Sequence, residues 1–269
     1  MELDIQKIIA IIHSAMMKKV TKFFGDFYLL PRLFKYIKNW PTFLLDHFKI
    51  KQRRYQLKLN NGLVFEVRPG TTDKGIVVEI FLLEDYKQAL GIIKSADLVI
   101  DIGAQIGVFS LYAYNANPKA KILSFEPYSA NFEMLKKNLI LNKASNIKPN
   151  QFAITSETKE VKLYLSDCNT GMHSLHRQTG KFEVVQGLGI NELFKRFNIS
   201  HCDLMKLDCE GAEAEIIADI EPVHLLSIRA IIMEYHDRAA IPKMEAKLKQ
   251  HGFQVEIQSH HSILFAYKQ

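Results

Sequence analysis

Apolar and polar residues alternate along most of this chain in a way that predicts strands and helices in turn. Short apolar runs, of the kind that a strand buried on both faces needs, are each followed by a segment with helical spacing. The predicted elements are 98–102, 106–114, 121–125, 129–141 and 147–154, and after an interruption 203–208, 212–219, 229–235, 239–251, 253–257 and 262–267. This alternation predicts an α/β fold with mostly parallel strands joined by right-handed crossovers. The two consecutive strands at the end predict an antiparallel last strand.

The residues before this series follow a different pattern. Pro31 and Pro41 divide the first fifty residues into two or three short predicted helices, because proline removes a backbone donor and clashes with the preceding turn. Alternating residues at 55–59 and 63–67 surround an Asn-Asn-Gly turn and predict a β-hairpin. Helical spacing follows from 75 to 93. We therefore expect a helical extension (1–50), a hairpin with a helix (51–95) and an α/β domain (96–269). In the interruption, 161–165 and 182–186 predict extra strands around a loop at 169–176.

The turn after the first strand of the α/β domain carries the most informative motif. It reads Asp-x-Gly-x-x-x-Gly from Asp101 to Gly107, and open α/β sheets bind nucleotide-like cofactors at such a turn. The glycines of Asp101–Gly107 let backbone and ligand approach where a Cβ would clash. The dinucleotide fingerprint would need further glycines where Gln105 and Val108 stand. The motif therefore favours S-adenosylmethionine, which has no pyrophosphate to cradle, over NAD.

A second carboxylate supports this interpretation. Glu126 closes the apolar strand at 121–125, at a spacing from the glycine turn that suits a ribose, and its carboxylate can accept both ribose hydroxyl protons. The alternative is that Asp101 caps a helix and that Glu126 is an exposed strand end.

Several motifs together resemble the FkbM-type S-adenosylmethionine-dependent methyltransferases. The residues that carry the resemblance are Asp73, Glu79-Ile-Phe81 with Tyr86, Asp101-Ile-Gly-Ala-Gln-Ile-Gly107, Phe125-Glu-Pro127 with Asn131 and Asn138, Lys206-Leu-Asp-Cys-Glu-Gly-Ala-Glu213, and Glu234 with His236. The family usually has Asn where this chain has Gln105. The resemblance implies a class I methyltransferase (Rossmann-like) fold, with a mostly parallel seven-stranded sheet behind the helical and hairpin extension. It also implies methyl transfer to hydroxyl groups, often on sugars or polyketide scaffolds.

The resemblance further implies where the cofactor lies. Asp101 and Gly103 would be near its methionine part, Glu126 on its ribose, and the segment 152–154 beside its adenine. The full set of cofactor-binding residues that we expect is Asp101, Gly103, Ala104, Gly107, Glu126, Pro127, Ala153 and Asp208.

Ionisable residues gather where the strands at 203–208 and 229–235 end: Lys206, Asp208, Glu210, Glu213, Glu234 and His236. A sugar hydroxyl is a poor nucleophile at neutral pH, so a base or a metal ion would help. We expect His236, Glu234, Asp208 and Glu210 to be catalytic. The rival hypothesis is that Asp208, Glu210 and Glu234 hold a divalent ion such as Mg²⁺. The structural alternatives are that Glu213 complements a helix amino terminus, that Glu234 pairs with Lys206 or Arg238, and that His236 is an ordinary strand-end histidine.

The other histidines and the cysteines carry less chemistry. His173 and His176 are expected in a loop over the cleft, without a third ligand for zinc. His260 and His261 are expected to be structural. Cys168, Cys202 and Cys209 form no Cys-x-x-Cys pair and are expected to be buried apolar residues in a reducing compartment.

Charge and aromatic residues concentrate at the amino terminus. The chain has a net charge of +6, and the first fifty residues hold eight Lys or Arg against Glu2, Asp4, Asp26 and Asp46, together with nine of the chain's aromatic residues. Basic and aromatic side chains together suit an interfacial helix on an anionic membrane. The alternative is a helical cap that packs its aromatics on the main domain. No nucleic-acid-binding motif accompanies the charge. Without a secretory signal or a spanning segment, we expect a cytoplasmic protein with peripheral association at the inner membrane surface through residues 1–50.

The leading functional hypothesis is an O-methyltransferase that acts on a saccharide or related metabolite, including one carried on a lipid. The alternatives are a nicotinamide-dependent oxidoreductase, against which the missing glycines argue, and a non-enzymatic module that uses the basic amino terminus at a membrane surface. The expected partner is a small-molecule or glycan acceptor. The sequence sets no oligomeric state.

Overall fold

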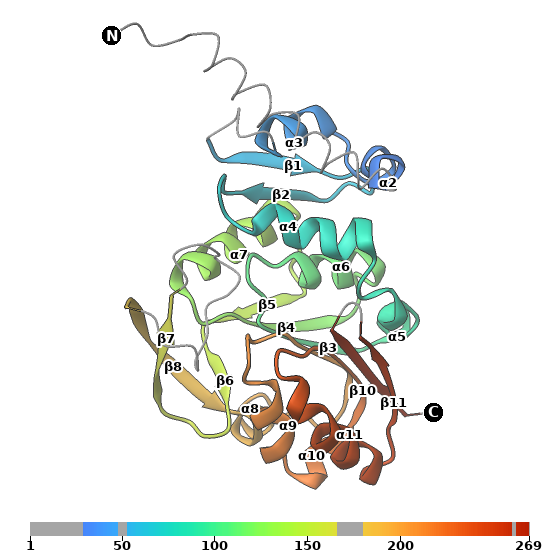
Figure 1. The fold of residues 1–269 in the computed structure, drawn as a ribbon, viewed down its shortest axis with the longest axis vertical. Helices are drawn as coiled ribbons and strands as arrows, with labels where there is room; N and C mark the ends of the chain where they lie inside the picture. The colour runs from blue at the N-terminus through green and yellow to red at the C-terminus, as the bar shows by residue number, and fades with distance from the viewer. Residues whose placement is uncertain (1–28, 48–52, 166–179, 260–261, 269) are drawn as a thin grey trace, which may run out of the picture.

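The computed structural model describes residues 29–47, 53–165, 180–259 and 262–268. Its centre is a seven-stranded sheet with the order β11-β12-β10-β9-β3-β4-β5 (Figure 1). β12 runs antiparallel to both β10 and β11, and the other neighbouring pairs are parallel, which confirms the predicted class I sheet and its antiparallel last strand. The strands are β3 (Leu98–Ile102), β4 (Lys121–Phe125), β5 (Ile147–Asn150), β9 (Cys202–Leu207), β10 (Ile228–Glu234), β11 (Gln254–Gln258) and β12 (Ile263–Tyr267).

Helices cover both faces of this sheet, with the green helices on one side and the orange and red helices on the other (Figure 1). Successive strand residues point to opposite faces, so both need apolar side chains. Val99 and Ile122 pack into one core with the first group of helices, whereas Ile100 and Leu123 pack into a second core with the other group. The first group is α5 (Leu90–Ser95), α6 (Val108–Ala116) and α7 (Ser129–Leu141), and the second is α8 (Ile190–Arg196), α9 (Glu213–Asp219), α10 (Pro222–Ser227) and α11 (Ile241–Gln250), preceded by η3 (Arg238–Ala240).

Two predicted elements are wrong in detail. The predicted helix 75–93 is broken into α4 (Asp73–Val77), the π-helix η1 (Val78–Leu83), the short 3₁₀ helix η2 (Lys87–Ala89) and α5, because Glu84 takes a left-handed conformation with φ of 62°. The predicted strand 147–154 is divided into β5, an edge strand whose Pro149 cannot donate a ladder hydrogen bond, and β6 (Ala153–Thr155). β6 joins a separate small sheet with β8 (Phe182–Gly189) and β7 (Glu160–Tyr164). Helices α8 and α10 were not predicted.

The amino-terminal extension contains α2 (Leu29–Tyr36), α3 (Trp40–His47) and the predicted hairpin, β1 (Tyr55–Lys58) with β2 (Val64–Val67). Pro31 and Pro41 lie inside α2 and α3, in the first turn, where a missing N–H costs no helical hydrogen bond. These positions let both prolines lie within a helix without breaking it. Within the described ranges no helix is long and apolar enough to cross a bilayer.

Asparagine side chains close both outer edges of the hairpin. On β1, Asn39 accepts from the Lys58 N–H at 2.8 Å and donates to the Gln56 carbonyl at 2.8 Å. On β2, Asn142, which caps the end of α7, accepts from the Val64 N–H and donates to its carbonyl, and Asn138 of α7 accepts from the Glu66 N–H at 2.8 Å. An amide presents one acceptor and two donors, so it can satisfy an edge strand as a neighbouring peptide unit would. The contacts on β2 attach the hairpin to α7 (Figure 1).

Several predictions concern residues that the structure does not describe. Residues 1–28, Cys168, the loop 169–176 with His173 and His176, and the pair His260 and His261 lie outside the described residues.

Candidate active site

The glycine turn follows β3 and is shaped by the protein's own atoms. Gly103 has φ of +77°, and a Cβ there would lie 1.7 Å from the Asp208 carbonyl oxygen. Gly107 has φ of +88°, and a Cβ there would lie 2.5 Å from Leu135 Cδ1. The turn therefore lies directly against the end of β9 and against α7. Gly103 is required by this approach to backbone and by its positive φ, whereas Gly107 is favoured by its positive φ, since the tip of the Leu135 side chain could move.

Asp101 is fully buried and does not face an open crevice. Its carboxylate accepts a hydrogen bond from Ser110 Oγ at 2.6 Å and lies 3.3 Å from Lys206 Nζ. The same ammonium group lies 3.2 Å from Asp208 and donates to the Gly103 carbonyl at 2.8 Å. Burial alone would lower the pKa of Lys206, but the carboxylates of Asp208 and Asp101 raise it, so this cation stays charged. Lys206 thus pairs with these two acids.

Glu126 is buried, so it is not an exposed strand end. One carboxylate oxygen accepts from the Gln105 N–H at 2.9 Å and the other from the Tyr128 N–H at 2.9 Å. Burial raises the pKa of Glu126 to about 7, against the opposing effect of these backbone donors. Asn131 also hydrogen-bonds this carboxylate, so a ligand hydroxyl would share it with three protein donors.

A pocket opens between the glycine turn, the ends of the central strands and η1. Its lining includes residues that the sequence predicted to be functional, namely Gly103, Ala104, Asp208 and Glu234. Asp101, Gly107, Glu126, Pro127 and Ala153 are not among the residues that line it, nor are the predicted catalytic residues Glu210 and His236. Ala153 is buried in β6, where it packs with Leu163 and Val185 of the small sheet.

Five further pocket residues come from the segment before the α/β domain, and three of them are ionisable: Glu79, Asp85 and Tyr86. Burial raises the pKa of Glu79 to about 7, with the negative charges of Asp208 and Asp85 adding to the effect. None of these residues was among the predicted cofactor-binding or catalytic residues. The available signal was the Glu79-Ile-Phe81 motif with Tyr86, in which a carboxylate interrupts an otherwise apolar segment.

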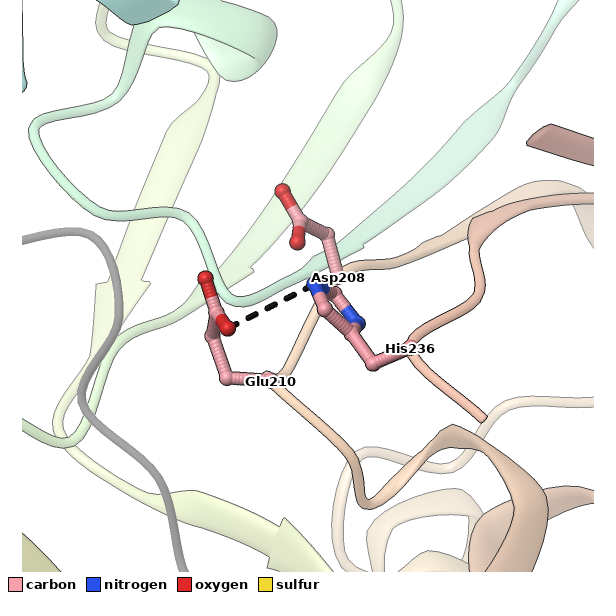
Figure 2. A group of neighbouring side chains, drawn as sticks. All are labelled: Asp208, Glu210 and His236. Carbon is pink, nitrogen blue, oxygen red and sulfur yellow. Dashed lines mark ion pairs between the residues drawn. The ribbon is translucent and has the colours of Figure 1, made fainter. Parts of the chain in front are cut away.

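His236 follows β10 and faces two residues that follow β9 (Figure 2). Its Nε2 lies 3.4 Å from Glu210 and 4.0 Å from Glu234. One ligand-type atom from each of His236, Glu210 and Asp208 lies within 4.8 Å of the others, a grouping that suits a cation. Asp208 and Glu210 do not share a strand face, because β9 ends at Leu207 and Glu210 turns with φ of 55°.

Glu213 orients this histidine. It is buried and accepts from the Cys209 and Gly211 N–H groups at 2.8 and 3.0 Å, which satisfies donors just before α9. Its Oε1 also lies 3.2 Å from His236 Nδ1. Burial would lower the pKa of His236, but Glu213 and the neighbouring acids raise it to about 9. Burial and Asp208 raise the pKa of Glu234 to about 8.

Comparison with known proteins agrees with this geometry. The family model described as the methyltransferase FkbM domain matches residues 101–255. The methyltransferase sdnD of Sordaria araneosa is 28% identical over 213 residues, which cover 67% of this chain and 82% of that protein. The 31-O-demethyl-FK506 methyltransferase FkbM of Streptomyces tacrolimicus is 25% identical over 232 residues, 74% of this chain and 88% of that protein.

Among solved structures, the precorrin-6y C5,15-methyltransferase of Geobacter metallireducens is similar with a TM-score of 0.44, at 15% identity over 69% of this chain and 88% of that one. The family model covers more than half of this chain and includes the glycine turn, Glu126 and the cluster around His236. The chain therefore belongs to the FkbM methyltransferase family and is an S-adenosylmethionine-dependent methyltransferase.

Proposed function

We propose that this enzyme methylates a hydroxyl group of a saccharide or a related hydroxylated metabolite. The observation that carries the proposal is the acidic lining of the pocket, where Glu79, Asp208 and Glu234 come together from three segments of the chain. Carboxylates accept hydrogen bonds from hydroxyl groups, so several of them can orient a polyhydroxylated acceptor. The name of one relative also refers to methylation at an oxygen.

The same residues suit the cofactor. S-adenosylmethionine supplies an electrophilic methyl group on a positively charged sulfonium. In our proposal Glu126 accepts the ribose hydroxyls, and Gly103 and Ala104 lie along the methionine part. The pocket carboxylates favour the positive charge that the cofactor brings. In the transfer a carbon–oxygen bond forms as the carbon–sulfur bond breaks, and the acceptor hydroxyl loses one proton. Holding oxygen, carbon and sulfur in line supplies much of the acceleration.

We assign that proton to His236 and Glu234. With Nδ1 of His236 donating to Glu213, its Nε2 faces Glu210 and the pocket carboxylate Glu234. A buried carboxylate that accepts a hydrogen bond from one ring nitrogen of a histidine orients the ring, so that the other nitrogen can accept the proton of the hydroxyl. Asp208 and Glu210 would stabilise the protonated imidazole.

A divalent cation such as Mg²⁺ is the alternative way to activate the hydroxyl. The grouping that suits a cation contains Asp208 and Glu210, as predicted, but has His236 in place of the predicted Glu234. The two hypotheses give opposite results in one assay. If the cation activates the hydroxyl, excess EDTA should abolish methyl transfer and added Mg²⁺ should restore it. Full activity in EDTA would assign the proton to His236 and Glu234 alone.

The proposed reaction is tested with a methyl-labelled cofactor. The purified enzyme is incubated with labelled S-adenosylmethionine and fractions of a cell extract, and the labelled product is located by mass spectrometry. We expect the label on a hydroxyl oxygen of a sugar-containing compound. A label on nitrogen, or on a product without sugar or other hydroxyl groups, would contradict the proposal. Calorimetric titration with NADH serves as the control for cofactor choice, with no binding expected.

We also propose that the extension lies on an anionic membrane and delivers a lipid-carried acceptor. Phe34 and Trp40 are exposed and form an edge-to-face pair with ring centroids 5.1 Å apart, and Lys35 and Lys38 beside them are exposed. Aromatic rings at headgroup level beside basic side chains suit such a surface. Tyr36 in α2 donates a hydrogen bond to Glu84 at 2.8 Å. Glu84 directly follows η1, and residues of η1 line the pocket. A bilayer at α2 would therefore lie close to the acceptor.

This hypothesis predicts binding to acidic vesicles that falls with salt. Replacing Lys35 and Lys38 by Glu should abolish sedimentation with acidic vesicles, since each lysine near such a surface contributes about 1 kcal/mol. Replacing Phe34 and Trp40 by Ala should weaken it. Ile140→Ala on α7, which removes another strongly exposed apolar side chain, is the control and should bind like the parent. If the extension is only a cap, the parent protein will not sediment with vesicles at all.

A further inference from the structure

We infer that Asp73, which lies outside the α/β domain and does not line the pocket, positions the cofactor-binding loop through Gln105. It would act as a positioning residue, with Arg68 as its partner. The inference rests on the proposed ribose role of Glu126, and it explains why a hairpin and a short helix precede the methyltransferase sheet.

Asp73 is fully buried at the first position of α4, and both of its oxygens are occupied. Oδ2 accepts from the backbone N–H and the Nε of Arg68, each at 2.9 Å. Oδ1 accepts from Arg68 Nη2 at 2.8 Å and from Gln105 Nε2 at 3.2 Å. Such a two-pronged pair of arginine and carboxylate fixes geometry as well as charge. The carboxylate therefore presents one oxygen to Gln105 in a fixed place.

Gln105 is held in an unusual conformation by three groups. Its φ is 50°, in the left-handed region that costs a residue with a side chain about 1 kcal/mol or more. Its side chain donates to Asp73 and accepts from the Ile106 N–H at 2.8 Å. This conformation aims the Gln105 N–H at Glu126, to which it donates at 2.9 Å. Asp73 and Glu126 are thus linked through a single residue.

A second route converges on the same carboxylate. Arg68 Nη2 also donates to Asn131 Oδ1 at 2.7 Å. Asn131 is buried in α7 and hydrogen-bonds Glu126. The ion pair of Arg68 and Asp73 therefore reaches Glu126 both through the glycine turn and through α7. Loss of Asp73 would release Gln105 from one of its three contacts and let the acceptor for the ribose move.

The test compares Asp73→Asn with Asp203→Asn. Asp203 is a matched control because it is also buried, accepts two backbone N–H groups, from Asp97 and Leu98, and lies at the opposite end of the sheet. We expect Asp73→Asn to raise the Kd for S-adenosylmethionine about tenfold or more, as loss of a charge-assisted contact implies. kcat at saturating cofactor should change little. Asp203→Asn should lower Tm without changing cofactor affinity.

Two further variants separate positioning from loss of folding. Gln105→Met keeps the pair of Arg68 and Asp73 intact and removes the link to it, together with the bond from the Ile106 N–H, so it should also raise the Kd. In the Glu126→Ala variant, adding Asp73→Asn should raise the Kd by a smaller factor than it does in the parent protein, because both changes act on one interaction. Unchanged cofactor affinity in folded Asp73→Asn, or full additivity with Glu126→Ala, would overturn the inference. An unchanged Kd in Glu126→Ala alone would instead overturn the ribose assignment.

Discussion

Glu126→Ala should weaken binding of S-adenosylmethionine by about 2 to 4 kcal/mol, because two ribose hydroxyls lose a charged acceptor. The structure adds a second reason for a large effect: the same carboxylate holds the N–H groups of Gln105 and Tyr128, so its loss also frees the glycine turn. The measurement is calorimetric titration of the folded variant with the cofactor. Circular dichroism checks that the variant is folded.

Glu126→Gln is the matched control for this result. The amide keeps the size of the side chain and one acceptor oxygen, so it should lose less affinity than Ala. In the parent protein, affinity should also fall as pH drops through about 7, the raised pKa of Glu126, because the protonated carboxyl is a weaker acceptor. This dependence should be absent in Glu126→Ala. Unchanged affinity in folded Glu126→Ala would remove the ribose assignment.

His236→Ala should lower kcat by roughly 10² to 10⁴, the usual contribution of a positioned general base, while the Kd for S-adenosylmethionine stays close to that of the parent. The pKa of His236 is raised to about 9 by Glu213 and neighbouring acids. A base must be deprotonated to accept a proton, so kcat/KM of the parent should rise with pH until about 9. The variant should lack that rise.

His201→Ala is a suitable control for His236→Ala. His201 also pairs with a carboxylate, Asp203 at 3.0 Å, but at the far end of the sheet. It should leave both kcat and the pH profile unchanged. If folded His236→Ala turns over at the parental rate, His236 is a structural residue and the proton goes elsewhere.

The central sheet was predictable because its strands are buried on both faces. Leu98–Ile102 is apolar at four of its five positions and Lys121–Phe125 at three, and the structure has both strands with the predicted bounds. The segment before the sheet was harder. A π-helix has nearly the same apolar spacing as an α-helix over one turn, so the periodicity of 75–93 gave no sign of η1 or of the turn at Glu84.

From the sequence, the site could be predicted only as a group of residues that follow neighbouring strands. The carboxyl ends of parallel strands meet at one edge, which is why Asp208, Glu234 and His236 lie together. Which side chains they contact depends on three-dimensional packing, and the spacing of residues along the chain does not encode it. Lys206 pairs with Asp101 from a neighbouring strand, and Glu79 enters the pocket from a segment more than a hundred residues earlier in the chain.

The asparagines at the hairpin edges bear on how the molecule behaves in concentrated solution. A strand with free N–H and C=O groups along its edge can pair with a strand of another molecule and so begin aggregation. Asn39 on β1, and Asn138 and Asn142 on β2, already occupy those groups. An aspartate in their place would accept but could not donate, and would leave a carbonyl open. The amides therefore protect this two-stranded sheet from edge-to-edge association.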